Sequence, residues 1–251
     1  MRENSALRGR LVEIFLPAIL ANNLDELGIR LGSRAAIATT VSGTRTTSDP
    51  ASLQPFLTKT YSLLDERNAS FERSTLVVGA EHDVLEGTLT FTQKGSVVDR
   101  PCAVFVTRRP DREIDVFLLV QVEGRSSFGP SAEAIVSAQA KPNVPVDVAE
   151  MIGACRMGDS ARVISFFEQF GTVRAGDGST FSAGEGGVRA FFEALFSRVR
   201  WIPNVHRCLD DGRKVALLCS FESSDFMLVF ERGDSGLLRT LTVYGSLEPL
   251  A

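Results

Sequence analysis

Three polar side chains in the second half of the chain are of the types that move protons in enzymes: His206, Asp225 and Tyr244. A histidine has a reference pKa of about 6.5, so it can act as a general base near neutral pH. A tyrosine together with an aspartate can stabilise a developing oxyanion. A structural role is the alternative for each. His206 would be a structural histidine with its hydrogen bonds made within the fold, Asp225 a polar residue at a strand end, and Tyr244 a core aromatic with a solvated hydroxyl.

A second group of residues is expected to line a ligand pocket: Arg174, Phe192, Trp201 and Cys208. Arg174 would provide a cation in this pocket, and an ion pair with an acidic loop is the alternative. The other histidine, His82, lies in a predicted turn between two acidic residues, and we expect it to be solvated.

Metal and phosphate sites are not indicated by the sequence. His206-x-Cys208 supplies only two of the four ligands that a structural zinc site requires. Gly184-Glu185-Gly186-Gly187 precedes a predicted helix but lacks the Lys-Ser/Thr ending of a phosphate-binding loop and the spacing of a dinucleotide site. We therefore expect no metal and no cofactor, and we interpret this segment as a flexible entry loop.

The composition excludes several classes of partner. The 251 residues are 44% hydrophobic and 23% charged, with a net charge of −4, as in an ordinary globular protein. Lysine and arginine do not exceed aspartate and glutamate in either half, so a nucleic-acid partner is not expected. The sequence contains no block of like charges that would indicate binding to a membrane surface.

The four cysteines favour a reducing compartment. Cys102, Cys155, Cys208 and Cys219 form no Cys-x-x-Cys pair and lie in apolar surroundings, so we expect free, buried thiols. The apolar run Leu11–Ala21 follows three arginines, as in a signal peptide, but Glu13 and Pro17 interrupt it. We interpret it as an amphipathic first helix and expect a cytoplasmic location.

Hydrophobic periodicity and turn residues predict the same order of elements in both halves: helix, helix, strand, helix, then a series of strands. In the strand Val84–Thr92, alternation places Leu85, Gly87, Leu89 and Phe91 on one face. The predicted helices are Leu7–Ala21, Leu24–Leu31, Asp49–Arg67, Val148–Arg156, Asp159–Phe167 and the segment after Gly187. The predicted strands are Ala35–Val41, Phe71–Gly79, Val84–Thr92, Pro101–Arg108, Glu113–Glu123, Thr172–Ala175, Ser179–Ser182, Val205–Leu209, Lys214–Glu222, Phe226–Glu231 and Leu237–Leu247.

This order predicts an internal duplication, with a first domain over residues 1–125, a linker over 126–145 and a second domain over 146–251. Aligning the two halves gives matches at nearly constant offsets, which change only in connecting segments. The aligned pairs are Phe56 with Phe191, Phe71 with Trp201, Leu85 with Val215, Leu89 with Cys219, Phe91 with Phe221 and Phe105 with Phe230.

The segment from Phe170 to Phe192 resembles a run found in nuclear-transport-factor-two-like domains, in particular their SnoaL-like, polyketide-cyclase-like branch. That run is Arg-x-x-Asp-Gly followed by Gly-x-x-x-Val/Ile-Arg-x-Phe-Phe. The residues that carry the resemblance are Val173, Arg174, Asp177, Gly178, Gly184, Val188, Arg189, Phe191 and Phe192, and the first half has a weaker version in Val41, Thr44, Arg45, Asp49, Leu53 and Phe56.

The resemblance implies an α+β fold in each half: a cone formed by a strongly curved mixed sheet that wraps around about three helices and encloses an apolar pocket. Members of the family include ketosteroid isomerase, scytalone dehydratase, polyketide cyclases, transport adaptors and proteins without known activity. The motif is therefore informative about the fold and leaves the function open. His206, Asp225 and Tyr244 do not reproduce the catalytic positions of ketosteroid isomerase. An Asp-Gly turn explains Asp177 without chemistry.

The strand Lys214–Glu222 is apolar on both faces, with Val215, Leu217 and Cys219 on one and Ala216 and Leu218 on the other. A sheet of this kind must be covered on both sides. We expect the first half of the chain to cover the face of Ala216 and Leu218 in an intrachain, pseudo-twofold pair, with a buried interface of about 1,200–2,000 Å². A homodimer through two second halves is the alternative.

Two functions remain open from the sequence. The first is binding of a small apolar ligand in a cone pocket, or action as a structural or interaction domain pair. The second is a cofactor-independent isomerase, dehydratase or cyclase in the second domain, with His206, Asp225 or Tyr244 moving a proton next to a carbonyl. The enzyme hypothesis requires at least two of these side chains to converge in one pocket.

Overall fold

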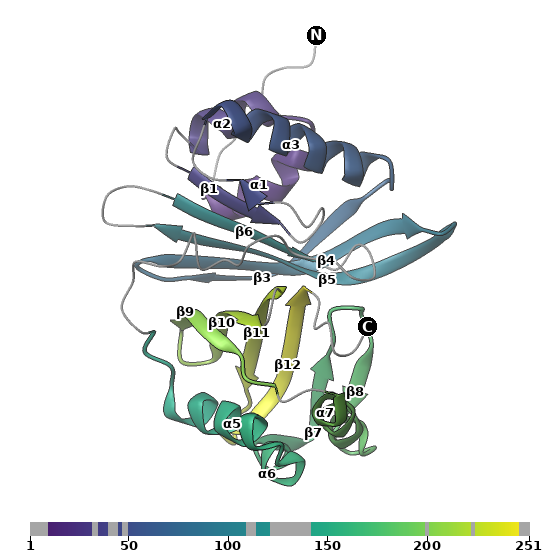
Figure 1. Cartoon of the computed structure of the whole chain (residues 1–251), viewed down its shortest axis with the longest axis vertical. Helices are drawn as coiled ribbons and strands as arrows, with labels where there is room; N and C mark the ends of the chain where they lie inside the picture. The colour runs from purple at the N-terminus through teal and green to yellow at the C-terminus, as the bar shows by residue number, and fades with distance from the viewer. Residues whose placement is uncertain are drawn as a thin grey trace. The chain divides into compact units, whose positions relative to one another are not determined.

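The structure is a computed structural model of the chain and describes residues 10–31, 35–39, 45–46, 50–108, 114–120, 142–198, 201–221 and 224–245. The chain divides into two compact units, Met1–Val120 and Gln121–Ala251 (Figure 1). Most of the predicted linker over 126–145 lies outside the described residues, and its last four residues lead into the first helix of the second unit.

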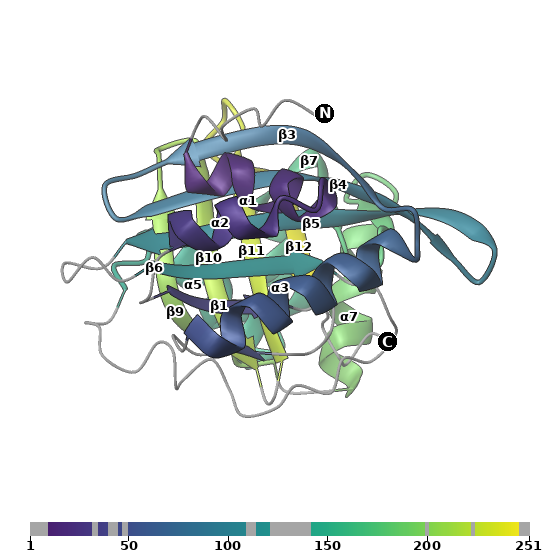
Figure 2. The same cartoon turned by 90° about the horizontal axis from the view of Figure 1, so that it is seen from above.

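The first unit combines three helices with a six-stranded mixed sheet. The strands follow the order β2-β1-β6-β5-β4-β3, in which β1 and β6 are parallel and the other neighbours antiparallel. Figures 1 and 2 show the helices on one face of the sheet. The elements are α1 (Leu11–Leu20), α2 (Leu24–Leu31), β1 (Ala35–Thr39), β2 (Arg45–Thr46), α3 (Pro50–Asp65), β3 (Ser70–Val78), β4 (His82–Gln93), β5 (Ser96–Arg108) and β6 (Ile114–Val120).

The second unit repeats this arrangement. Its strands follow the order β8-β7-β12-β11-β10-β9, again with a single parallel pair, β7 with β12. The elements are α5 (Val146–Met157), α6 (Ser160–Ser165), β7 (Phe167–Arg174), β8 (Thr180–Ser182), α7 (Gly187–Arg198), β9 (Asn204–Asp210), β10 (Lys214–Phe221), β11 (Ser224–Arg232) and β12 (Leu238–Gly245).

The identical strand order in the two units confirms the predicted duplication and the α+β fold that the resemblance implies. Aligned residues such as Phe56 and Phe191, on α3 and α7, and Phe105 and Phe230, on β5 and β11, fall on corresponding elements. The pair Phe71 and Trp201 does not: Phe71 lies on β3 opposite Leu89, whereas Trp201 precedes β9, and Val205 lies opposite Cys219. The pseudo-twofold pairing of the two units stays a prediction.

Local signals mark several element boundaries correctly. Asp159 caps α6, because its carboxylate accepts a hydrogen bond from the backbone N–H of Arg162 at 2.9 Å. Pro50 begins α3 as predicted, whereas its predicted N-cap, Asp49, lies outside the described residues. Lys94 and Gly95 both have positive φ, 51° and 81°, as a two-residue hairpin turn requires. This tight turn lets β5 begin at Ser96, five residues before the predicted start.

Two predictions about the elements are wrong. The helix predicted over Asp159–Phe167 ends at Ser165, and Phe167 already belongs to β7, where its side chain is 5% exposed. His82 is not solvated in a turn: it begins β4, is half-buried, and lies with its ring 5.5 Å from that of Phe105. The neighbouring Asp83 is buried, with its carboxylate bound by Arg108 and 3.8 Å from Arg10.

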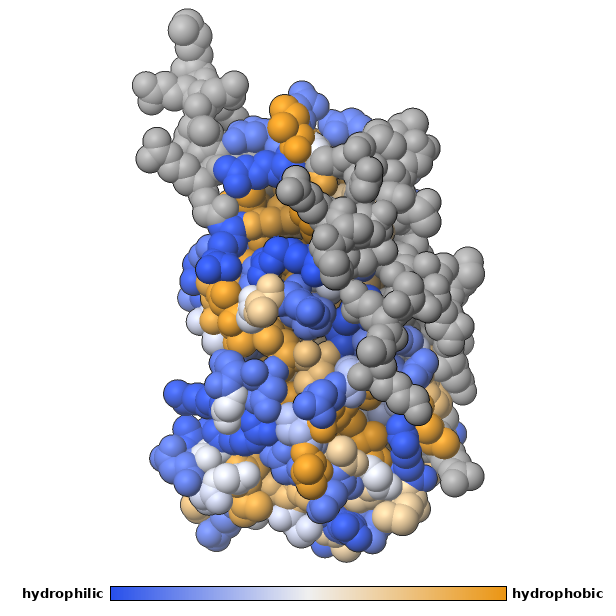
Figure 3. Space-filling model, turned by 90° about the vertical axis from the view of Figure 1, so that its left-hand side faces the viewer, coloured by the Kyte–Doolittle hydropathy of each residue, from blue (hydrophilic) through white to orange (hydrophobic). Residues whose placement is uncertain are grey.

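The described surface is mixed in character. Hydrophilic and hydrophobic residues are interspersed on the face in Figure 3, in keeping with the balanced charge of the sequence. Within the described ranges, no helix has both the length and the apolar character needed to cross a bilayer.

The predicted face of β4 is buried, and one glycine on it is sterically required. Leu85, Leu89 and Phe91 are at most 1% exposed. At Gly87, the neighbouring strand β3 approaches so closely that a Cβ atom would overlap the backbone oxygen of Glu72 and the ring of Phe71. The absence of a side chain at Gly87 therefore allows Phe71 to cover this part of the sheet.

We expect Gly87→Ala to destabilise the protein by about 1–3 kcal/mol, because the added methyl group must displace a strand backbone and an aromatic ring. Gly28→Ala is the control: Gly28 lies in α2, where a Cβ atom would meet its nearest neighbour at 3.6 Å. Urea unfolding followed by circular dichroism measures both variants. Equal stability of the two variants would show that the backbone at Gly87 adapts freely.

Candidate functional site

The candidate site lies in the core of the second unit, between the helices and one face of the sheet. Helices α5, α6 and α7 and strands β7, β10, β11 and β12 all contribute to one apolar cluster. Its aromatic members are Phe167, Phe191, Phe192, Trp201, Phe226 and Phe230, each at most 5% exposed. Val205, Cys208, Phe221 and Phe196 pack against it and are only partly buried.

Strand alternation determines which residues enter this core. On β10, Val215, Leu217 and Cys219 belong to the cluster, whereas Ala216 and Leu218 point to the opposite face. Both Ala216 and Leu218 are nevertheless buried, at 3% and 0% exposed. That the first half of the chain covers the second face stays a prediction.

Trp201 occupies the end of the sheet where β9 and β11 begin and β10 ends. It lies between α7 and β9, is 2% exposed, and its ring centroid is 6.1 Å from that of Phe226. Strand pairing places Val205, Cys219 and Phe226 side by side beneath it. Its indole Nε1 is buried and has no hydrogen-bond partner among the described residues.

We call the partly buried residues at this end, Phe196, Val205 and Phe221, the Trp201 rim. Phe196 lies near the end of α7, with its ring 5.7 Å from that of Phe192. Val205 lies at the start of β9, an edge strand, and Phe221 at the end of β10. The rim is therefore the border between the aromatic core and the surface of this unit.

Three of the four predicted pocket residues meet at this core. Phe192 and Trp201 belong to the cluster, and Cys208 packs against it. Arg174 does not: its neighbour Val173 enters the core, so alternation along β7 directs Arg174 to the other face. The structure therefore gives the pocket no cation from Arg174.

The predicted catalytic histidine faces away from this core. His206 is 8% exposed, and its Nε2 lies 2.7 Å from the hydroxyl oxygen of Ser220. Ser220 lies between Cys219 and Phe221, which both face the cluster, so Ser220 and its partner are on the opposite side of β10. A β-bulge where β9 pairs with Leu218 and Cys219 causes this orientation.

The other two catalytic candidates do not complete a site with His206 in the described part of the chain. Tyr244 follows the core residue Val243 on β12 and so faces away from the cluster, 4% exposed. Two strands separate β12 from β9, which puts the backbones of Tyr244 and His206 about 14 Å apart. Asp225 pairs with Ser220 in the strand register, and its side chain lies outside the described residues.

The four cysteines are free, as predicted, and their environment makes them poor nucleophiles. Burial raises the pKa of the Cys219 thiol, and also that of Cys102 and Cys155, well above the ordinary range. Burial, together with the nearby Asp210, raises the pKa of Cys208 to about 11. The thiols at this core therefore stay protonated near neutral pH.

A second polar feature lies at the opposite end of the unit and was not found from the sequence. We call Arg232, Asp147 and Asp210 the Arg232 cluster. Arg232 donates to both carboxylate oxygens of Asp147, at 2.8 and 3.1 Å, and to Asp210 at 3.0 Å. The three residues come from β11, α5 and β9, so no short sequence motif could reveal them.

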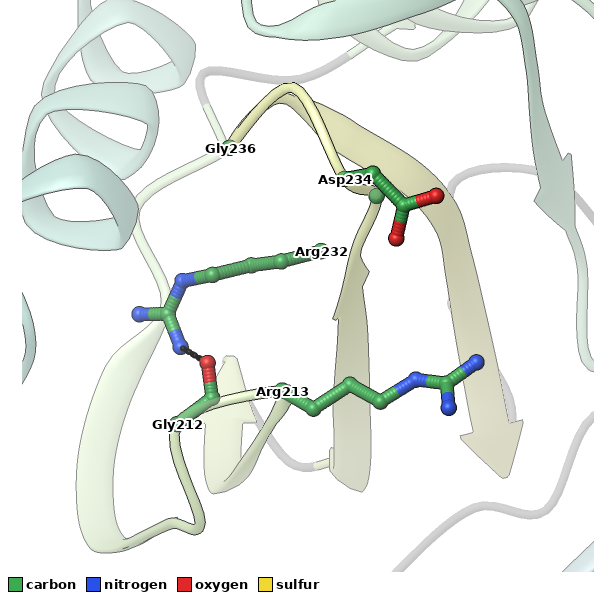
Figure 4. Close-up of a pocket in the computed structure, with 6 residues that line it drawn as sticks. Gly212, Arg213, Arg232, Asp234 and Gly236 are labelled. Atoms are coloured by element: carbon green, nitrogen blue, oxygen red, sulfur yellow. Dashed lines mark hydrogen bonds between the residues drawn. The ribbon is translucent and has the colours of Figure 1, made fainter.

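The Arg232 cluster borders an open pocket of about 360 Å³, lined by Gly212, Arg213, Arg232, Gly233, Asp234 and Gly236. Figure 4 shows the guanidinium of Arg232 directed at the carbonyl of Gly212, with Arg213 pointing the other way. Arg213 is paired with Glu231 at 2.9 Å. Because carboxylates compensate both arginines, the pocket offers no excess positive charge for an anion. No group of three potential metal ligands occurs among the described residues.

The Arg232 cluster gives the second unit a pH-dependent stability. The hydrogen bonds from Arg232 hold the pKa of Asp147 below its ordinary value, against partial burial, which raises it. A lowered folded-state pKa contributes stability above the unfolded-state pKa of about 4, and this contribution is lost as the pH falls through the folded-state pKa.

We expect Asp147→Asn to lower the free energy of unfolding at pH 7 by about 1–2 kcal/mol, a value between those of exposed and buried ion pairs. The deficit relative to the unmodified protein should shrink below pH 4. Urea unfolding followed by Trp201 fluorescence measures it, because Trp201 is the single tryptophan. Asp234→Asn, which changes a fully exposed carboxylate, should match the unmodified protein at each pH. A deficit that does not vary with pH would contradict this assignment.

No protein-family model and no curated protein matches the sequence. Solved structures are similar to parts of the chain. One is an NTF2-like protein of unknown function from Cytophaga hutchinsonii, with 16% identity over 41% of this chain and 90% of that chain, and a TM-score of 0.35. Another is a protein with a ketosteroid isomerase-like fold from Catenulispora acidiphila, in complex with trimethylamine. It has 14% identity over 49% of this chain and 100% of that chain, and a TM-score of 0.38. A third is a putative polyketide cyclase from Sinorhizobium meliloti, with 14% identity over 44% of this chain and 94% of that chain, and a TM-score of 0.35. None of these values links the chain to an activity.

Proposed function

We propose that the second unit binds a small apolar ligand at the end of its core where Trp201 lies. The observation that carries this proposal is that the side chains of the Trp201 rim are incompletely covered. The core behind it is fully buried and aromatic, whereas Phe196, Val205 and Phe221 are only partly buried. Covering such apolar surface gains about 25 cal/mol for each Å² removed from water.

The chemistry of this end favours an uncharged, apolar ligand. Ligand sites are typically concave and lined by hydrophobic and aromatic side chains with few polar groups. The core cluster consists of hydrophobic residues, its cysteines are protonated, and Arg174 is directed to the other face. A charged ligand would lose its hydration here without gaining a counter-charge from the cluster.

The alternative, proton transfer by His206, Asp225 or Tyr244, has no comparable support in the described residues. It needs two of these groups to converge in one pocket, whereas His206 and Tyr244 face away from the aromatic core on strands that are not neighbours. Action of the two units only as a structural or interaction pair is the other alternative, and it predicts that no ligand binds near Trp201.

The test uses N-phenyl-1-naphthylamine, an uncharged apolar fluorescent probe, with the folded full-length protein. Excitation of Trp201, the only tryptophan, should produce probe emission by energy transfer, because a probe at the Trp201 rim lies beside the indole. Val205→Phe should weaken probe binding about tenfold or more, because the larger side chain fills the entry and adds the cost of overpacking.

Val97→Phe is the matched control, with the same change at a side chain of the first unit that is 75% exposed. It should leave probe binding and energy transfer unchanged. The proposal is contradicted if the probe does not bind, or if it binds without quenching Trp201 and with equal affinity for the two variants.

A further inference from the structure

We draw no further inference here: the strongest candidate, the hydrogen-bonded side-chain pair of His206 and Ser220 on the face of the second sheet that points away from the aromatic core, lies on a face for which nothing in the structure shows what covers it.

Discussion

Each unit depends on the pairing of its first and last strands, β1 with β6 and β7 with β12. These pairs are parallel, so no tight turn can join their strands, and the rest of the unit must form the connection. In the second unit, α7 crosses from β8 to β9, and three antiparallel pairings return the chain to β12 beside β7. The sheet and the helices that cover it consequently form one cooperative structure, and the aromatic core lies inside this connection.

A charge cluster connects the first helix to the sheet in both units, with the signs exchanged. In the second unit, one arginine at the end of β11 lies between the carboxylates of Asp147 and Asp210. In the first unit, one carboxylate, Asp83, lies between Arg108 at the end of β5 and Arg10 at the start of α1. Breaking such a pair costs more than forming it gains, so these clusters act mainly to specify how helix and sheet meet.

The sequence predicts the elements well and the direction of individual side chains less well. Periodicity and turn residues suffice for the order of helices and strands, because each signal is local. Alternation correctly places Val215, Leu217 and Cys219 in the core. It cannot determine the direction of His206, because the β-bulge in β9 directs both Val205 and Cys208 to the core and turns the histidine to the other face. A bulge depends on the partner strand, which a single segment does not reveal.

The candidate site shows a related limit, since partners distant in sequence determine whether a polar group is satisfied. The Arg232 cluster joins three elements that are remote along the chain, and its hydrogen bonds use most of the capacity of the guanidinium. Trp201 is the converse case, a residue expected in the pocket whose donor finds no partner among the described residues. Both are polar groups in a well-packed unit. The guanidinium of Arg232 is hydrogen-bonded within the fold, whereas the indole N–H of Trp201 has no partner among the described residues. A buried donor without a partner reduces stability, so the indole N–H of Trp201 weakens the core that its ring helps to fill.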